Sequence, residues 1–207
     1  MHKITFISTV HKEIGKCNAD ELHKIIEQVN PEVIFLEALD GSYSKYEQIN
    51  FSQFQVPHNK LEIAAIQKYS DKYIPVLDNK MSDAFEKKYS SLPENIELRK
   101  LLDDFNFLAN EYGFQFLNSK ESIMRQEEMR IIESSLLNDE KLNIKAREAI
   151  DGYEDSMLRN IYSYCKSNEF DRAVFMCGVA HRKSIIEKVK KRNTQEEISL
   201  NWVVFGN

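Results

Sequence analysis

The sequence contains few cysteines, and none is spaced for a disulfide framework or a zinc knuckle. Cys17, Cys165 and Cys177 are an odd number and form no CxxC pair, which is typical of a protein from a reducing compartment. The first ten residues lack the long apolar core and the small-residue cleavage site of a signal peptide. No apolar stretch approaches the ~20 residues that cross a bilayer. We therefore expect a cytoplasmic protein with no membrane partner.

The chain also lacks the short motifs of several enzyme classes. It has no GxSxG nucleophile elbow, and no Walker loop, GxGxxG or HExxH motif. Its net charge is -5, and its single basic cluster is KVKKR at 188–192. That cluster is the pattern of a solvated helix end. Because nucleic-acid binding needs a basic face, we expect no nucleic-acid partner.

Five short apolar runs predict the strands of a mainly parallel sheet. They are almost continuously apolar, as strands buried on both faces are. With 207 residues, of which 42% are hydrophobic, the chain has enough apolar residues for one α/β domain with three layers, a sheet covered by helices on both faces. The runs are KITFIST (3–9), EVIFLE (32–37), YIPVLD (73–78), AVFMCG (173–178) and LNWVVF (200–205).

Helical patterns separate these runs. Asn18, with Glu21 three residues later, predicts the N-cap of a helix at 19–29, and further helices are expected at about 60–72 and 182–192. The segment 41–58 has no clear periodicity and is interpreted as a loop over one sheet edge. Residues from about 80 to 168 show only helical spacing, with possible breaks at Gly113 and Gly152. They predict a helical insertion between the third and fourth strands.

The insertion carries two apolar stripes, which must be buried against the sheet, against each other or against a second copy of the chain. Our hypothesis is a helical cap over a cleft, with part of its surface available for a homodimer. The alternative is a set of ordinary sheet-covering helices. The first stripe is Leu101, Leu102, Phe105 and Leu108, and the second is Met124, Met129, Ile132 and Leu136.

Titratable side chains follow the predicted strands at their carboxyl ends, where ligands bind in open α/β sheets. His11 follows the first strand, Glu37 ends the second, Asp78 ends the third, and His181 follows the fourth. Two imidazoles with one or two carboxylates can hold a divalent metal. They can equally supply a general base and an electrostatic stabiliser without a metal. The sequence leaves both possibilities open.

Each of these residues also has an ordinary structural interpretation. His11 could bond a backbone carbonyl, Glu37 could be the first solvated residue after its strand, and Asp78 could cap the helix that starts near Ser82. His181 could close its strand. Glu62, on the helix LEIAAIQKY, could face solvent. The convergence of the strand-end residues on one edge favours a site over four independent structural roles.

Several of these residues also lie in recognisable motifs. GVAH at 178–181 is a GxxH motif, and STVH at 8–11 has the same spacing with Ser8 in place of glycine. With Glu37 in PEVIFLEA and with EDSMLRNI at 154–161, the sequence resembles the superfamily of Tiki proteases, TraB-type proteins, erythromycin esterases and ChaN-like haem-binding proteins. The resemblance equates Met157 with the methionine of an R-x-x-x-M helix, but Tyr153 stands where that motif has arginine. Arg125 or Arg159 are the candidates to replace it.

The resemblance extends to LEIAAIQKYSDKYIPVLDNK and covers about half of the chain, leaving the helical middle unmatched. It implies a hydrolase of peptide or ester bonds centred on His11, Glu37 and His181, with Glu62 and Asp78 as supporting groups or base. In a metal-assisted version, His11, Glu37 and His181 would hold Mn, Co or Zn. The alternative is a non-catalytic module that binds a small ligand, haem or a partner protein. The departures at Ser8 and Tyr153 favour that alternative.

Overall fold

The computed structural model of the chain describes residues 2–39, 60–69, 73–137 and 139–206. The predicted loop at 41–58 lies outside the described residues. The structure is an α/β fold around a five-stranded, all-parallel sheet with the strand order β3-β2-β4-β1-β5. This confirms the predicted fold class. The strands are β1 (Lys3–Thr9), β2 (Val33–Leu39), β3 (Ile74–Leu77), β4 (Arg172–Gly178) and β5 (Asn201–Val204).

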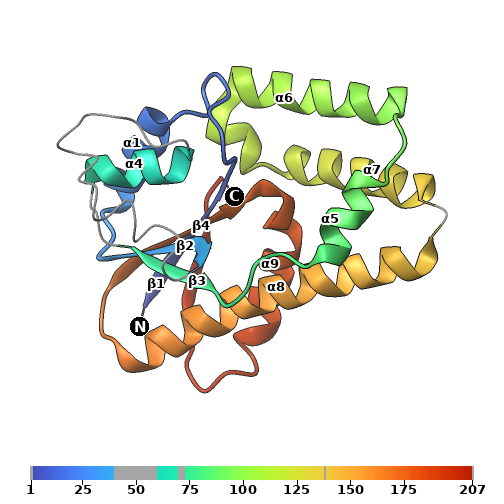
Figure 1. Cartoon of the computed structure of the whole chain (residues 1–207). Coiled ribbons are helices and arrows are strands. Elements are labelled where there is room, and N and C mark those ends of the chain that lie inside the picture. The colour runs from blue at the N-terminus through green and yellow to red at the C-terminus, as the bar shows by residue number, and fades with distance from the viewer. Residues whose placement is uncertain (1, 40–59, 70–72, 138, 207) are drawn as a thin grey trace.

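The strand order places β4 at the centre of the sheet, between β1 and β2. Phe6 of β1 pairs with Phe175 of β4, and Phe35 of β2 pairs with the same Phe175. Two strands that are far apart in sequence, β1 and β4, thus lie side by side (Figure 1). The pairing sets Thr9, rather than Ser8, beside Gly178. The two GxxH-like segments are therefore offset by one residue.

Helices cover both faces of the sheet because successive strand side chains point to opposite faces. On β4, Val174 and Met176 pack into one apolar cluster, whereas Phe175 and Cys177 pack into the other. The first cluster is closed by helices α1 (Ala19–Val29), α4 (Leu61–Tyr69) and α6 (Ile96–Leu117). The second is closed by α8 (Glu140–Ser167) and α9 (Arg182–Arg192). The three predicted layers follow from this alternation.

Several local predictions are confirmed and two are wrong. The Asn18 side chain accepts a 3.0 Å hydrogen bond from the Glu21 amide at the start of α1, as expected of an N-cap. Strand β2 continues past Glu37 to Leu39, so Glu37 lies inside the strand rather than at its end. Gly113 does interrupt α6, with a φ of 60°. Gly152 is not a break, because α8 runs through it without interruption.

The predicted insertion contains four helices, and it joins the sheet at both of its ends. Helix α5 (Asp83–Ser90), α6, α7 (Lys120–Leu136) and α8 follow β3 in that order. Figure 1 shows α6, α7 and α8 as long helices beside the sheet, with α5 between α7 and α8. The C-terminal half of α8 covers the sheet, since Leu158 and Ile161 belong to its apolar cluster. The insertion is thus partly a sheet-covering layer.

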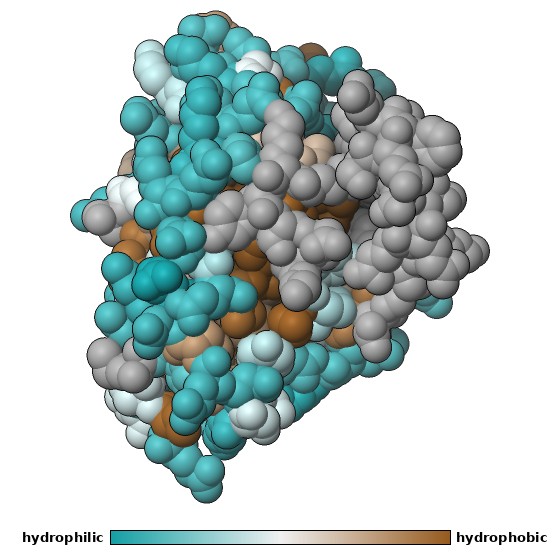
Figure 2. Space-filling view, turned by 90° about the vertical axis from the view of Figure 1, so that its left-hand side faces the viewer, coloured by the Kyte–Doolittle hydropathy of each residue, from teal (hydrophilic) through white to brown (hydrophobic). Residues whose placement is uncertain are grey.

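The predicted apolar stripes are only partly buried. Phe105 and Met129 are core residues, but Leu102 is 48% exposed and Met124 is 62% exposed. The helices turn those two outward in the single chain, and their burial against a second copy stays a prediction. The face in Figure 2 is mainly hydrophilic, with hydrophobic side chains gathered near its middle. Among the described residues, no helix has the length and apolarity that a bilayer span requires.

The two glycines of the insertion give opposite predictions for alanine substitution. Gly113 has a φ of +60°, and an added methyl group would lie 2.9 Å from the Lys16 carbonyl oxygen. We expect Gly113→Ala to lower the free energy of unfolding by ~1–3 kcal/mol. Gly152 has helical geometry and nothing within 4 Å of the added methyl group, so Gly152→Ala should raise it by up to ~1 kcal/mol. Urea denaturation measures both, and equal effects would contradict the assigned backbone geometry.

Candidate active site

Three of the predicted residues meet at the carboxyl edge of the sheet. Hydrogen-bonded strands lie ~4.8 Å apart, so the ends of β1 and β2 are separated by ~10 Å across β4. A methyl group added to Gly178 would lie 3.5 Å from Glu37 Oε2, 3.7 Å from His11 Nε2 and 3.8 Å from the Cδ2 atom of His181. The side chains of β1, β2 and β4 therefore surround the space in front of this one glycine.

His11 is oriented by a glutamate from helix α4. Its Nδ1 atom lies 3.1 Å from Glu62 Oε1, and the Thr9 hydroxyl donates a 2.7 Å hydrogen bond to the same oxygen. The Glu62 side chain is only 5% exposed, whereas that of His11 is 49% exposed. With Nδ1 held by the carboxylate, Nε2 is the ring nitrogen that faces the centre. The solvent-facing interpretation of Glu62 is therefore wrong, and its supporting role is the one that fits.

His181 is oriented in the same way by a glutamate from helix α8. His181 closes the short 3₁₀ helix Val179–His181, which follows β4 directly. Its Nδ1 atom lies 2.8 Å from Glu154 Oε1, and the Ser184 hydroxyl donates to the other Glu154 oxygen. Both side chains are nearly enclosed, with Glu154 2% exposed and His181 12% exposed. The Nε2 atom of His181 then faces Glu37, 3.8 Å from Oε1.

Glu37 lies between the two imidazoles and is fixed at both oxygens. The Gly178 amide donates a 2.7 Å hydrogen bond to Oε2, and the Tyr153 hydroxyl donates a 2.9 Å hydrogen bond to Oε1. The Tyr153 ring also stacks on the His181 ring, with centroids 5.6 Å apart. Tyr153, which stands where the motif described above has arginine, is thus a neutral hydrogen-bond donor to the central carboxylate.

The His11–Glu62 pair shifts the pKa of both partners toward the charged forms. The hydrogen bond to Glu62 raises the pKa of His11 above its usual 6.5, outweighing burial, which lowers it. For Glu62 the largest single effect is burial, which raises its pKa. The charge of His11 and the hydrogen bonds from His11 and Thr9 together outweigh burial, so the pKa of Glu62 is lowered from 4.5. Both shifts favour the ion pair of a His11 imidazolium with a Glu62 carboxylate.

A buried arginine explains why serine rather than glycine stands at position 8. Arg182, which is 1% exposed, donates to the Ser8 hydroxyl at 3.3 Å and to Asn118 Oδ1 at 2.9 Å. Asn118, between α6 and α7, also accepts a 2.7 Å hydrogen bond from the Ser8 amide. Burial lowers the pKa of Arg182 to about 10. These contacts fix the end of β1 to the insertion.

Asp78 and the candidate replacement arginines are paired with groups other than His11, Glu37 and His181. Asp78 pairs with Arg159 and accepts a 2.7 Å hydrogen bond from Asn160, which ties the end of β3 to α8. Arg125 lies 3.7 Å from Glu121 on its own helix. Within the described residues, no contact joins Asp78, Arg159 or Arg125 to His11, Glu37 or His181. Neither arginine takes the place of Tyr153.

Sequence reasoning missed Glu154 and the burial of Arg182. Glu154 lies in line with Leu158, Ile161 and Cys165 on the buried face of α8, and a carboxylate on such a stripe is rarely buried without a partner. Arg182 likewise precedes the buried Ile185 by three residues on α9. A charged residue in register with an apolar helix face was the available signal.

The predicted metal ligands are the side chains of His11, Glu37 and His181. Within the described ranges, no three His, Cys, Asp or Glu side chains form a group that could hold a metal ion. Both oxygens of Glu37 already accept hydrogen bonds. These positions do not fit a three-ligand centre, so the proposed mechanism takes no step through a metal. Divalent-metal or haem binding stays a prediction.

Comparison with models of protein families, with curated proteins and with solved structures found no significant match.

The pKa shifts predict a defined pH window for the His11–Glu62 pair. The stabilisation linked to His11 is full below pH 6.5 and is lost as the pH rises through its higher folded-state pKa. The stabilisation linked to Glu62 is full above pH 4.5 and is lost as the pH falls through its lower folded-state pKa. The pair thus stabilises the fold most between pH 4.5 and pH 6.5.

Histidine NMR titration checks this prediction directly. We expect a pKa above 6.5 for His11 and a lower pKa in Glu62→Gln, because the acceptor carboxylate is gone. Glu27→Gln is the matched control, since Glu27 pairs with the remote His23, and it should leave the His11 titration unchanged. A His11 pKa that does not respond to Glu62→Gln would contradict the assigned contact.

Proposed function

We propose that the protein is a hydrolase of peptide or ester bonds, with Glu37, His11 and His181 at its active centre. One observation carries the proposal. Two imidazoles are each held at Nδ1 by a glutamate, and both rings meet the central carboxylate of Glu37 around Gly178. A carboxylate that fixes the tautomer and orientation of a histidine is a recurrent device of acid–base catalysis.

In the proposed reaction, Glu37 is the general base. It takes a proton from a water molecule, whose oxygen forms a bond with the substrate carbonyl carbon. The His11 imidazolium donates from Nε2 to the oxygen on which negative charge develops. When the bond to the leaving group breaks, Glu37 returns the proton to the departing nitrogen or oxygen. Atoms and charges balance, since one water is consumed and Glu37 ends as a carboxylate.

Tyr153 and His181 position Glu37 in this scheme. Hydrogen bonds from Tyr153 and from the Gly178 amide leave each oxygen of Glu37 with a remaining lone pair directed elsewhere. The stacked ring of His181 closes the side of the centre that faces α8. The choice of peptide or ester substrates rests on the sequence resemblance alone.

The rival proposal is a binding module that keeps the fold without turnover. The observation that favours it is the neutral hydroxyl of Tyr153 at Glu37, where the resemblance implies an arginine. A missing positive charge would leave the developing oxyanion with fewer stabilising groups. Under this proposal the space around Gly178 binds a ligand and releases it unchanged.

Two substitutions test catalysis without disturbing the fold. Glu37→Gln keeps the volume and removes the base, so hydrolysis should fall by a factor of about 10²–10⁴. Gly178→Ala should also abolish hydrolysis, because its methyl group occupies the space between Glu37 and His11 at ordinary contact distances. Gly178 has a φ of -55°, which alanine adopts freely. Hydrolysis is measured on panels of ester and peptide substrates, with and without Mn, Co or Zn.

The control is Glu32→Gln, which removes a half-exposed carboxylate just before β2, at the opposite end of that strand from the centre. It should retain full activity. Wild-type protein that hydrolyses no ester or peptide with any of these metals would contradict the hydrolase and favour the binding module. Activity that survives in Glu37→Gln would remove Glu37 from the role of base.

A further inference from the structure

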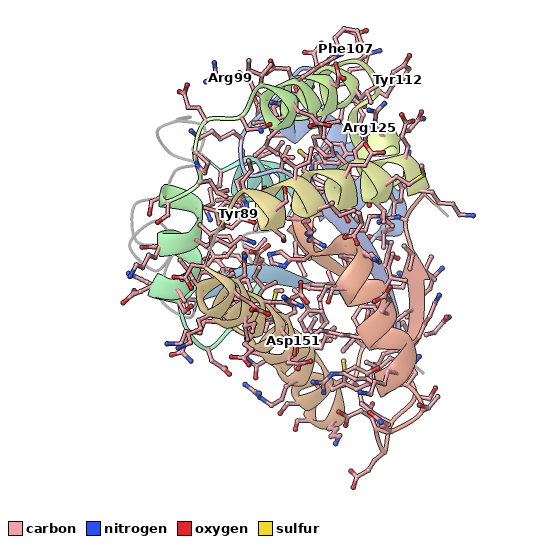
Figure 3. The ribbon with its side chains drawn as sticks, turned by 90° about the vertical axis from the view of Figure 1, so that its right-hand side faces the viewer. Tyr89, Arg99, Phe107, Tyr112, Arg125 and Asp151 are labelled. Carbon is pink, nitrogen blue, oxygen red and sulfur yellow. The ribbon has the colours of Figure 1, made fainter. Side chains whose placement is uncertain are left out.

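A second cavity lies behind the Glu154–His181 pair, away from Glu37. Its volume is about 260 Å³, and it opens between α5, α7, α8 and the start of α9. In Figure 3, Tyr89 lies where α5 approaches α7, and Asp151 marks α8 on the other side. The lining residues that matter here are Lys88, Arg130, Arg147, Ser184 and Glu154.

The carboxylates around this cavity are already paired with other cations. Glu127 binds Arg130 at 2.8 Å and Lys183 at 2.6 Å. Asp151 binds Lys188. Glu154 is occupied by His181 and Ser184. Little negative charge is therefore left to balance the remaining cations of the lining.

Lys88 is the most unusual of those cations. It is only 9% exposed, and its ammonium nitrogen lies 5.6 Å from the centre of the Tyr89 ring. Within the described ranges, no carboxylate lies within 4.0 Å of it and no hydrogen bond joins it to another group. Glu133 is near enough for its pKa to respond to Lys88, but its Oε2 accepts from the Tyr89 hydroxyl. Lys88 thus presents an ammonium without a paired anion at the cavity wall.

Arg147 gives the cavity a second cation without a paired carboxylate. It projects from α8 into the lining, and among the described residues no carboxylate or carbonyl binds it. Arg130 adds a second guanidinium, which is paired with Glu127 and also donates to the Ala180 carbonyl beside His181. The lining thus offers hydrogen-bond donors and positive charge.

We propose that this cavity binds a small oxyanion of the phosphate class, held by Lys88, Arg130 and Arg147. Arginine forks bind phosphate oxygens in a bidentate manner, and lysine supplies a point charge. The volume of about 260 Å³ falls below the ~300–1,000 Å³ of sites for drug-sized ligands. Inorganic phosphate or a small phosphate monoester fits it.

The position of the cavity connects the bound anion to the candidate active site. Ser184 and Glu154 line it, and both belong to the contacts that hold His181. A phosphate there lies on the far side of Glu154 from the imidazole. The binding proposal stands without the hydrolase proposal, because affinity is measured directly and not through turnover.

The test is calorimetric titration of the full chain with sodium phosphate at constant ionic strength. We expect saturable binding, weakened about ten-fold or more by Lys88→Met and by Arg147→Gln, which is the effect of losing one charge-assisted hydrogen bond. Lys88→Met should be at least as resistant to thermal unfolding as wild type, because methionine keeps the apolar contacts of this 9% exposed side chain and no ion pair is lost. If Lys88 only stabilised the fold, the Lys88→Met substitution would instead lower the unfolding temperature.

The matched control is Lys145→Gln, which removes an exposed charge from the same helix two residues before Arg147 and outside the lining. Its phosphate affinity should equal that of wild type. If Lys88→Met does not fold, the exposed Arg147→Gln variant decides the test. Absence of phosphate binding, or equal weakening by Lys145→Gln, would overturn the proposal.

Two further ligands identify the source of the phosphate. Tighter binding of glycerol phosphate than of inorganic phosphate supports a phosphate monoester as the occupant. The reverse order supports free phosphate. Binding of malonate with no binding of either phosphate would overturn the phosphate class, because the site would then be a carboxylate site.

Discussion

The central position of β4 determines where every functional group in this molecule lies. Because β4 pairs with β1 on one side and β2 on the other, the carboxyl ends of three strands meet within ~10 Å. His11 lies two residues after β1, Glu37 lies within β2, and His181 closes the 3₁₀ helix that follows β4. If β4 lay at an edge of the sheet, it would have only one strand neighbour, and side chains from three strands could not surround Gly178.

The helices then determine the hydrogen-bond partner and the orientation of each histidine at that edge. Helix α4 supplies Glu62 to His11, and α8 supplies Glu154 to His181. Burying a lone carboxylate is costly, and the two nearly enclosed glutamates are each paired with an imidazole instead. The insertion is therefore part of the site itself, through Tyr153 and Glu154 on α8. The same helix faces the second cavity, so one element links the proposed catalytic and phosphate-binding regions.

Much of this arrangement could be predicted from the sequence, because it depends on local patterns. Almost continuously apolar runs predicted the parallel strands, and Asn18 predicted the start of α1. His11 and His181 follow from their positions just after apolar runs, and Glu37 follows from its place near the end of such a run, although β2 continues to Leu39. The partners of these residues depend on how distant helices dock, which no local pattern specifies. The sequence therefore did not decide whether Glu62 faces solvent or the site. It placed Asp78 with the centre, although Asp78 binds Arg159. It did not identify Glu154.

The central claim is that both histidines are fixed at Nδ1 by glutamates, so that Nε2 of each ring faces Glu37. Long-range ¹H–¹⁵N NMR spectra of the imidazole rings test it most directly, because they distinguish the two neutral tautomers. When the rings are neutral, we predict a proton on Nδ1 and none on Nε2, for His11 and for His181. In Glu154→Gln this preference should weaken at His181 and persist at His11. Neutral rings with the proton on Nε2, or a rapid mixture of tautomers at both positions, would contradict the account.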